Sequence, residues 1–79
     1  MLTPAQCRAA RALLDWSQQQ LAHTAAVGIV TVRQFEAGKG QPRRATLTVI
    51  KQALEGAGVE FTNGDRPGVR LNKSPIRDK

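Results

Sequence analysis

The sequence has few of the residues from which small proteins build catalytic, metal or disulfide sites. Its 79 residues include one cysteine, one histidine and no tyrosine. Cys7 cannot form an internal disulfide, and Cys7 with His23 falls short of the ligand set of a structural zinc site. We find no Ser/His/Asp or Cys/His set, no paired carboxylates and no phosphate-cradling glycine motif. The sequence therefore predicts neither an enzyme nor a bound cofactor or metal.

Long apolar runs are also absent. No stretch approaches the roughly 20 apolar residues of a membrane span. Residues 1–10 have neither the basic start nor the apolar middle of a signal peptide. The single thiol fits a reducing compartment. We therefore expect a soluble cytoplasmic protein that has no membrane partner.

Basic charge is plentiful. Twelve Lys and Arg residues outnumber six Asp and Glu, for a net charge of +6. This balance favours a polyanionic partner such as nucleic acid. Proteins that bind single strands without sequence preference use exposed aromatic residues for stacking, and the aromatic residues here are only Trp16, Phe35 and Phe61. Double-stranded DNA is the better expectation.

Apolar spacing, helix caps and helix breakers predict a mainly α fold of four to five helices with a short C-terminal β-hairpin. Thr3-Pro4 begins the first helix, whose packing face is predicted to hold Cys7, Ala10, Leu13 and Leu14. The predicted helices span about 4–14, 18–25, 29–37 and 45–57, and the strands span 59–61 and 69–71. We divide the chain into a helical domain (1–58), a hairpin extension (59–71) and a disordered tail (72–79).

The second and third predicted helices are short and joined by a tight turn. Two such helices can hold the second one where it fits the major groove of B-DNA. That arrangement needs small or apolar residues where the helices meet. The residues at those places are Leu21, Ala22, Val27, Val32 and Phe35.

The segment SQQQLAHTAAVGIVTVRQFEAG, from Ser17 to Gly38, resembles the helix-turn-helix of the lambda repressor and Cro proteins, the XRE family. The resemblance extends over roughly Gln6 to Ala57 and implies a lambda-repressor-like bundle. Two positions differ from the family pattern. Ala26 stands where a glycine usually makes the turn, and Gly28 stands where Ser or Thr usually caps the recognition helix. A left-handed conformation at Ala26 costs about 1–2 kcal/mol.

The resemblance also implies roles for individual residues. A pair formed by Arg11 and Glu36 would brace the recognition helix on the first helix. Residues implied to face base edges are Ile29, Val30, Arg33 and Gln34. Residues implied to contact the DNA backbone are Gln18, Thr31, Lys39, Arg43 and Arg44.

These observations predict a sequence-specific DNA-binding transcriptional regulator. We expect a homodimer on a pseudo-palindromic operator, because one such unit contacts only a half-site. The hairpin is the predicted dimer interface, through Val59, Phe61, Val69 and Leu71. The alternative is an antitoxin or protein-interaction module that binds a partner protein, with DNA binding secondary.

Overall fold

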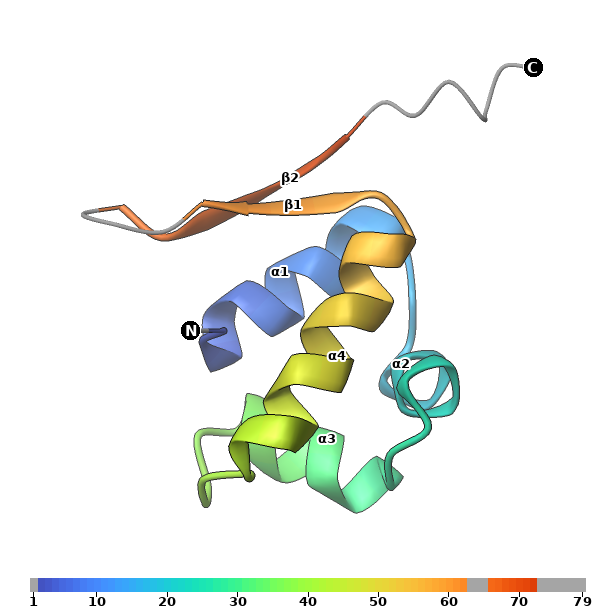
Figure 1. The fold of residues 1–79 in the computed structure, drawn as a ribbon, viewed down its shortest axis with the longest axis vertical. Coiled ribbons are helices and arrows are strands. Elements are labelled where there is room, and N and C mark those ends of the chain that lie inside the picture. Colours follow the sequence, from blue (N-terminus) through green and yellow to red (C-terminus); the bar gives the residue numbers. More distant parts are fainter. Residues whose placement is uncertain (1, 63–65, 73–79) are drawn as a thin grey trace.

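The computed structural model describes residues 2–62 and 66–72, and within them four helices precede a two-stranded antiparallel sheet (Figure 1). This confirms the predicted mainly helical fold with a C-terminal hairpin, and the described ranges contain four helices rather than five. The predicted tail lies outside these ranges, apart from Asn72. The elements are α1 (Pro4–Leu14), α2 (Gln18–Ala25), α3 (Ile29–Glu36), α4 (Arg44–Gly56), β1 (Val59–Thr62) and β2 (Gly68–Leu71).

The start of α1 is fixed by a reciprocal cap. Thr3 Oγ1 accepts a hydrogen bond from the Gln6 amide at 3.0 Å, and the Thr3 amide donates to Gln6 Oε1 at 3.1 Å. The same buried Gln6 side chain donates through Nε2 to the carbonyl oxygens of Thr62 and Gly68, each at 3.1 Å. The sequence predicted the Thr3 cap but not this link. Gln6 thus ties the start of α1 to the hairpin.

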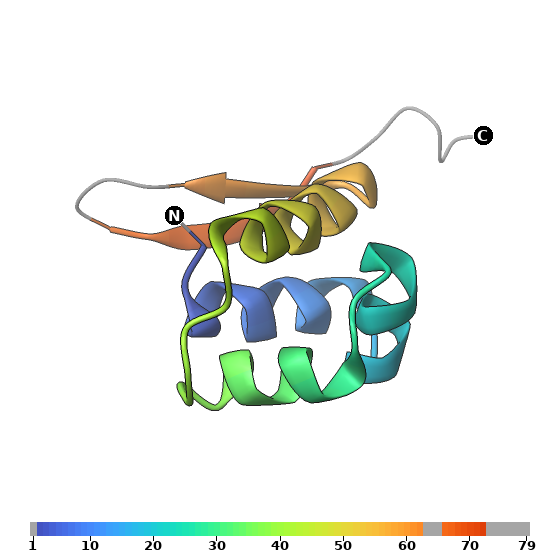
Figure 2. The ribbon, with the colours of Figure 1, turned by 60° about the horizontal axis from the view of Figure 1, so that its bottom comes forward.

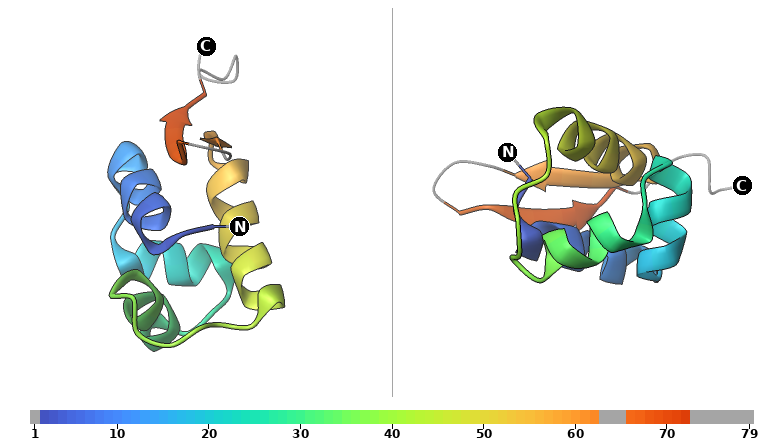
Figure 3. Two further views of the ribbon diagram at one scale, coloured as in Figure 1. Left: turned by 90° about the vertical axis from the view of Figure 1, so that its left-hand side faces the viewer. Right: turned by 90° about the horizontal axis from the view of Figure 1, so that it is seen from below.

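The helices surround one core, and the hairpin closes one end of it. β2 contacts α1 and β1 contacts α4, so these two helices lie under the sheet (Figure 3). α3 lies at the opposite end of the molecule from the hairpin (Figures 1 and 2). The buried apolar residues are Leu2, Cys7, Ala10, Leu21, Ala22, Ala25, Val32, Phe35, Leu47, Ile50, Leu54 and Val59.

One residue of the predicted α1 packing face is not buried. Leu13 is 41% exposed, whereas Cys7 and Ala10 are fully buried and Leu14 packs against the core. Successive helical residues turn by about 100°, so Leu13 lies well to one side of the stripe that Cys7 and Leu14 share. Its predicted core position was wrong.

Candidate nucleic-acid interface

The turn between α2 and α3 is built on Ala26. Its backbone is left-handed, with φ 59° and ψ 43°, and its amide donates to the carbonyl oxygens of Ala22 and His23. Gly28 caps α3 with an extended backbone and no side-chain hydrogen bond. The turn therefore forms with alanine in the conformation that usually favours glycine.

Ala26→Gly is expected to raise the free energy of unfolding by about 0.5–1 kcal/mol. Glycine removes a left-handed strain of about 1–2 kcal/mol from the folded state. Part of that gain is offset because glycine increases the conformational entropy of the unfolded chain. Ala12→Gly, at an exposed position inside α1, should instead lower it by about 1 kcal/mol. Urea unfolding of both variants checks the prediction. A destabilised Ala26→Gly would show that the alanine is not strained.

α3 presents one face to the core and another to solvent. Val32, Phe35 and Glu36 are buried, and on the other side Val30 is 54% exposed beside exposed Arg33 and Gln34. The predicted base-contacting face is therefore exposed to solvent, at the end of the domain opposite the hairpin (Figure 2).

Two further residues of α3 are less accessible than the sequence suggested. Ile29 is half-buried and packs against the core, because the first turn of α3 follows directly on the α2–α3 turn. Thr31 is also half-buried. The exposed part of the predicted base-contacting set narrows to Val30, Arg33 and Gln34, with Ile29 at its edge.

The predicted pair of Arg11 and Glu36 is formed and is bidentate. Arg11 Nε lies 2.7 Å from Glu36 Oε2, and Arg11 Nη2 lies 2.7 Å from Oε1. Arg11 Nη1 also donates to the Trp16 carbonyl at 2.8 Å, and Arg8 donates to the Glu36 carbonyl. Planar, charge-assisted pairs of this kind are among the stronger hydrogen bonds in proteins. The end of α3 is thus fixed to α1.

Glu36 has two more partners that the sequence analysis missed. Gln18 Nε2 donates to Oε1 at 3.0 Å, and Cys7 Sγ lies 3.1 Å from Oε2. The residue types of Gln18 and Cys7 did not indicate these contacts, because only the fold brings α1, α2 and α3 together around Glu36. Gln18 was predicted to contact a phosphate, but the structure directs its amide nitrogen to Glu36. We call Arg11, Glu36, Gln18 and Cys7 the Glu36 cluster.

The cluster shifts the pKa of its members in opposite directions. Burial by itself would raise the pKa of Glu36, but hydrogen bonds from Arg11, Gln18 and Cys7 lower it below the usual value. Burial, and then the hydrogen bond to Glu36, raises the pKa of Cys7 far above its usual value. Cys7 therefore stays a neutral thiol, a buried donor rather than a reactive nucleophile.

The loop after α3 brings Lys39 close to the exposed face. Gly38 and Gly40 have φ of 76° and 77°, which lets the chain turn sharply around Lys39. A hollow of about 300 Å³ lies between α3 and this loop. Gln41, which the sequence analysis did not select, is one of its lining residues, together with Thr31, Gln34, Phe35, Lys39, Gly40 and Pro42.

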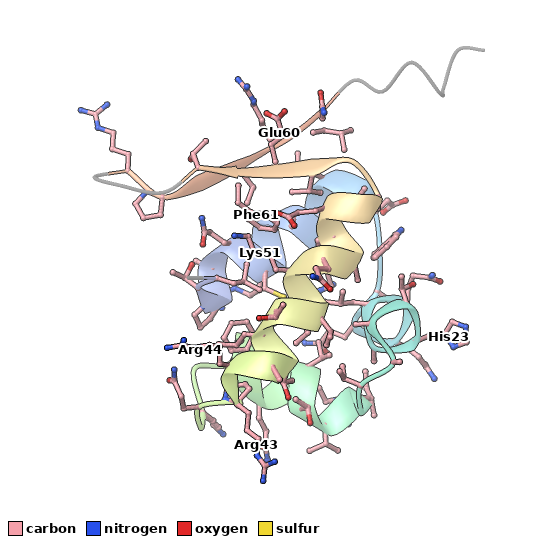
Figure 4. The ribbon with its side chains drawn as sticks, viewed as in Figure 1. His23, Arg43, Arg44, Lys51, Glu60 and Phe61 are labelled. Carbon is pink, nitrogen blue, oxygen red and sulfur yellow. The ribbon has the colours of Figure 1, made fainter. Side chains whose placement is uncertain are left out.

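Arg43 and Arg44 point to different sides of the molecule (Figure 4). Arg43 occupies the N-cap position of α4 without a side-chain capping hydrogen bond, and it points toward the α3 end. Arg44, the first residue of α4, points sideways and lines a different hollow. Adjacent residues diverge because α4 begins between them. Of these two cations predicted to contact the DNA backbone, Arg43 is the one that points toward the α3 end.

The four hairpin residues predicted at a dimer interface are mostly used by the chain's own core. Val59 is 2% exposed, and Phe61 and Val69 pack against the core. Only Leu71, at 47%, is well exposed. The prediction must be corrected for Val59, whose side chain a partner cannot reach. The strands pair in the register Val59 with Leu71 and Phe61 with Val69, beside an exposed ion pair of Glu60 with Arg70.

Residues 2–62 and 66–72 contain no group of three or more His, Cys, Asp or Glu side chains placed to hold a metal. In the same residues, no helix has the length and apolar character to cross a membrane. No family model and no curated protein matches this chain.

Proposed function

We propose that the protein is a sequence-specific DNA-binding transcriptional regulator that inserts α3 into the major groove. The observation that carries the proposal is the exposed row of Val30, Arg33 and Gln34 on a helix whose opposite face is fully anchored. The Glu36 cluster fixes that helix against α1 and α2. The resemblance of residues 17–38 to the lambda repressor and Cro helix-turn-helix supports the same assignment.

Each exposed side chain has a matching group in the major groove. Arg33 would form a fork to guanine O6 and N7, and Gln34 would form a pair of hydrogen bonds with adenine. Val30 would pack on a thymine methyl group. A good bidentate contact contributes about 1–3 kcal/mol of discrimination against the wrong base, so Arg33 and Gln34 would carry most of the specificity.

Selection from a random duplex library tests this function. The expected outcome is recovery of one shared sequence motif, bound more weakly when the motif is scrambled. Recovered duplexes without any common motif would contradict sequence-specific binding.

Lys39 and Arg43 would supply affinity through phosphates. Lys39→Ala and Arg43→Ala should each weaken binding to specific and scrambled duplexes alike. Each phosphate contact releases counterions on binding, so the loss of one contact should reduce the slope of log K against log salt by about 0.9. Arg66→Ala, an exposed cation beside β2 at the hairpin end, is the matched control and should leave the slope unchanged. Anisotropy titrations over a salt series measure all three, and unchanged slopes for Lys39→Ala and Arg43→Ala would remove them from the interface.

A second copy would join through the hairpin backbone rather than through most of the predicted side chains. Within the described residues the sheet has two strands, and such ribbons leave edges open for pairing. Antiparallel pairing of two sheet edges keeps both inner faces on the same side. Because α3 lies opposite the hairpin (Figure 1), both copies would present α3 toward one DNA face.

Light scattering at micromolar concentration should give twice the chain mass of 8.6 kDa. Leu71→Lys should shift the protein toward the monomer, because an added lysine disfavours edge pairing. Leu13→Lys, which places the same charge at a comparably exposed position of α1, should remain dimeric. A monomeric wild-type protein, both free and on DNA, would contradict the dimer.

A further inference from the structure

A second basic surface lies beside the first half of α4, away from the exposed face of α3. A hollow of about 250 Å³ is lined there by Leu2, Arg44, Leu47, Thr48 and Lys51, which we call the α4 groove. Leu2 and Leu47, at 4% and 5% exposure, form an apolar floor. Arg44 and Lys51 are two helical turns apart, about 10 Å along the axis. The groove thus combines an apolar floor with a cation toward each end.

The two cations are available to a partner. The ion pairs among the described residues join Arg11 to Glu36 and Arg70 to Glu60, so neither pair uses Arg44 or Lys51. Lys51 Nζ lies 5.8 Å from the centre of the Phe61 ring, which holds the ammonium group beside the groove (Figure 4). An anionic group can therefore approach both cations without displacing a carboxylate of residues 2–62 or 66–72.

The size and chemistry of the groove favour a peptide segment. Small-molecule sites are typically about 300–1,000 Å³, and this hollow of about 250 Å³ falls below that range. DNA phosphates would satisfy the cations but would leave the apolar floor uncovered. Lys51, beside Phe61, lies nearer the hairpin, whereas Arg43 points toward the α3 end (Figure 4).

Segments of this chain itself are poor occupants. Residues 73–79 contain three Lys or Arg residues and one Asp, so their charge matches that of the groove. The whole chain has only six acidic residues, and two of the described ones, Glu36 and Glu60, are already paired. The groove is complementary to a carboxylate-rich segment with an apolar side chain. Such a segment must come from another protein.

We propose that the α4 groove docks an acidic segment of a partner protein, with carboxylates on Arg44 and Lys51 and an apolar side chain between them. This second activity is independent of base reading by α3. It would let the regulator hold DNA and a partner protein at the same time, on separate surfaces.

NMR titration of the full chain with a designed peptide tests the proposal. The probe is the capped peptide Ala-Glu-Ala-Ala-Leu-Leu-Ala-Ala-Glu-Ala, whose glutamates match the spacing of Arg44 and Lys51 when the peptide binds as a helix. Amide shifts should concentrate at Leu2 and over 44–51 and should leave α3 unchanged. The same peptide with both glutamates replaced by glutamine should bind about tenfold more weakly. The second peptide tests the charge requirement on the unaltered protein.

Variants then separate the two surfaces. Lys51→Glu, at the hairpin end of the groove, should weaken peptide binding by about tenfold and leave DNA affinity nearly unchanged. Arg43→Glu should do the reverse, and Arg66→Glu, with the same charge change at the hairpin, should affect peptide binding little. Three results would overturn the proposal that the α4 groove docks an acidic segment. They are the absence of saturable binding at millimolar peptide, equal binding of both peptides, and amide shifts centred on α3. A protein that binds the peptide but not DNA would overturn only the regulator function.

Discussion

Replacing Glu36 with alanine is expected to lower the free energy of unfolding by about 3 kcal/mol or more. The change removes the acceptor for Arg11, Gln18 and Cys7 and leaves a partly buried guanidinium without its counter-charge. Breaking a buried pair from one side costs about 3–5 kcal/mol. For a domain of this size the loss is a large fraction of the total stability. Urea unfolding followed by circular dichroism measures it.

Glu60→Ala is the matched control for this prediction. It removes the acid of the other ion pair, whose side chains in Glu60 and Arg70 are 41% and 73% exposed. An exposed pair contributes about 0–1 kcal/mol, so this variant should be near wild type. Equal losses in the two variants would show that the Glu36 cluster does not brace the fold.

The same cluster predicts a direction of pH dependence. The pKa of Glu36 is lowered in the folded protein, so its ionised form stabilises the fold at pH values above the unfolded pKa of about 4.3. That contribution is lost as the pH falls through the folded-state pKa. The urea midpoint of the wild type should therefore decrease below about pH 4. In Glu36→Gln, which has no carboxyl group to protonate, the decrease should be smaller.

The second large effect is on DNA discrimination. Arg33→Ala combined with Gln34→Ala should remove about 2–6 kcal/mol of discrimination, which is the sum of two bidentate base contacts. Both side chains are exposed on α3, so the double variant should keep its fold and unfold near the wild-type urea concentration. Its remaining binding should follow salt as non-specific binding does.

Helix positions were the part of the fold that the sequence predicted best. The bounds of α1 and α2 were predicted to the residue, and α3 and α4 were predicted within one residue at each end. Caps and breakers determine these positions locally: Thr3 and Ser17 accept hydrogen bonds from amides three residues on. The left-handed backbone at Ala26 was also expected from its place in the motif.

Side-chain partners across elements were harder to predict. Gln6 was given no role and Gln18 was predicted to contact the DNA backbone, yet each bonds to a group on another element. A local pattern carries no information about which distant polar group a helix face will meet. The divergence of Arg43 and Arg44 has the same origin, because it depends on where α4 begins and on what packs beside it.

The central claim is that the exposed face of α3 reads bases, and the ratio of two dissociation constants tests it most directly. These are the constants for a duplex selected from a random library and for its scrambled counterpart, measured at one salt concentration. For the wild type the scrambled duplex should bind about 10³-fold or more weakly. For the Arg33→Ala, Gln34→Ala variant the ratio should fall toward one, with scrambled-duplex affinity little changed. A variant that keeps the wild-type ratio would contradict the account.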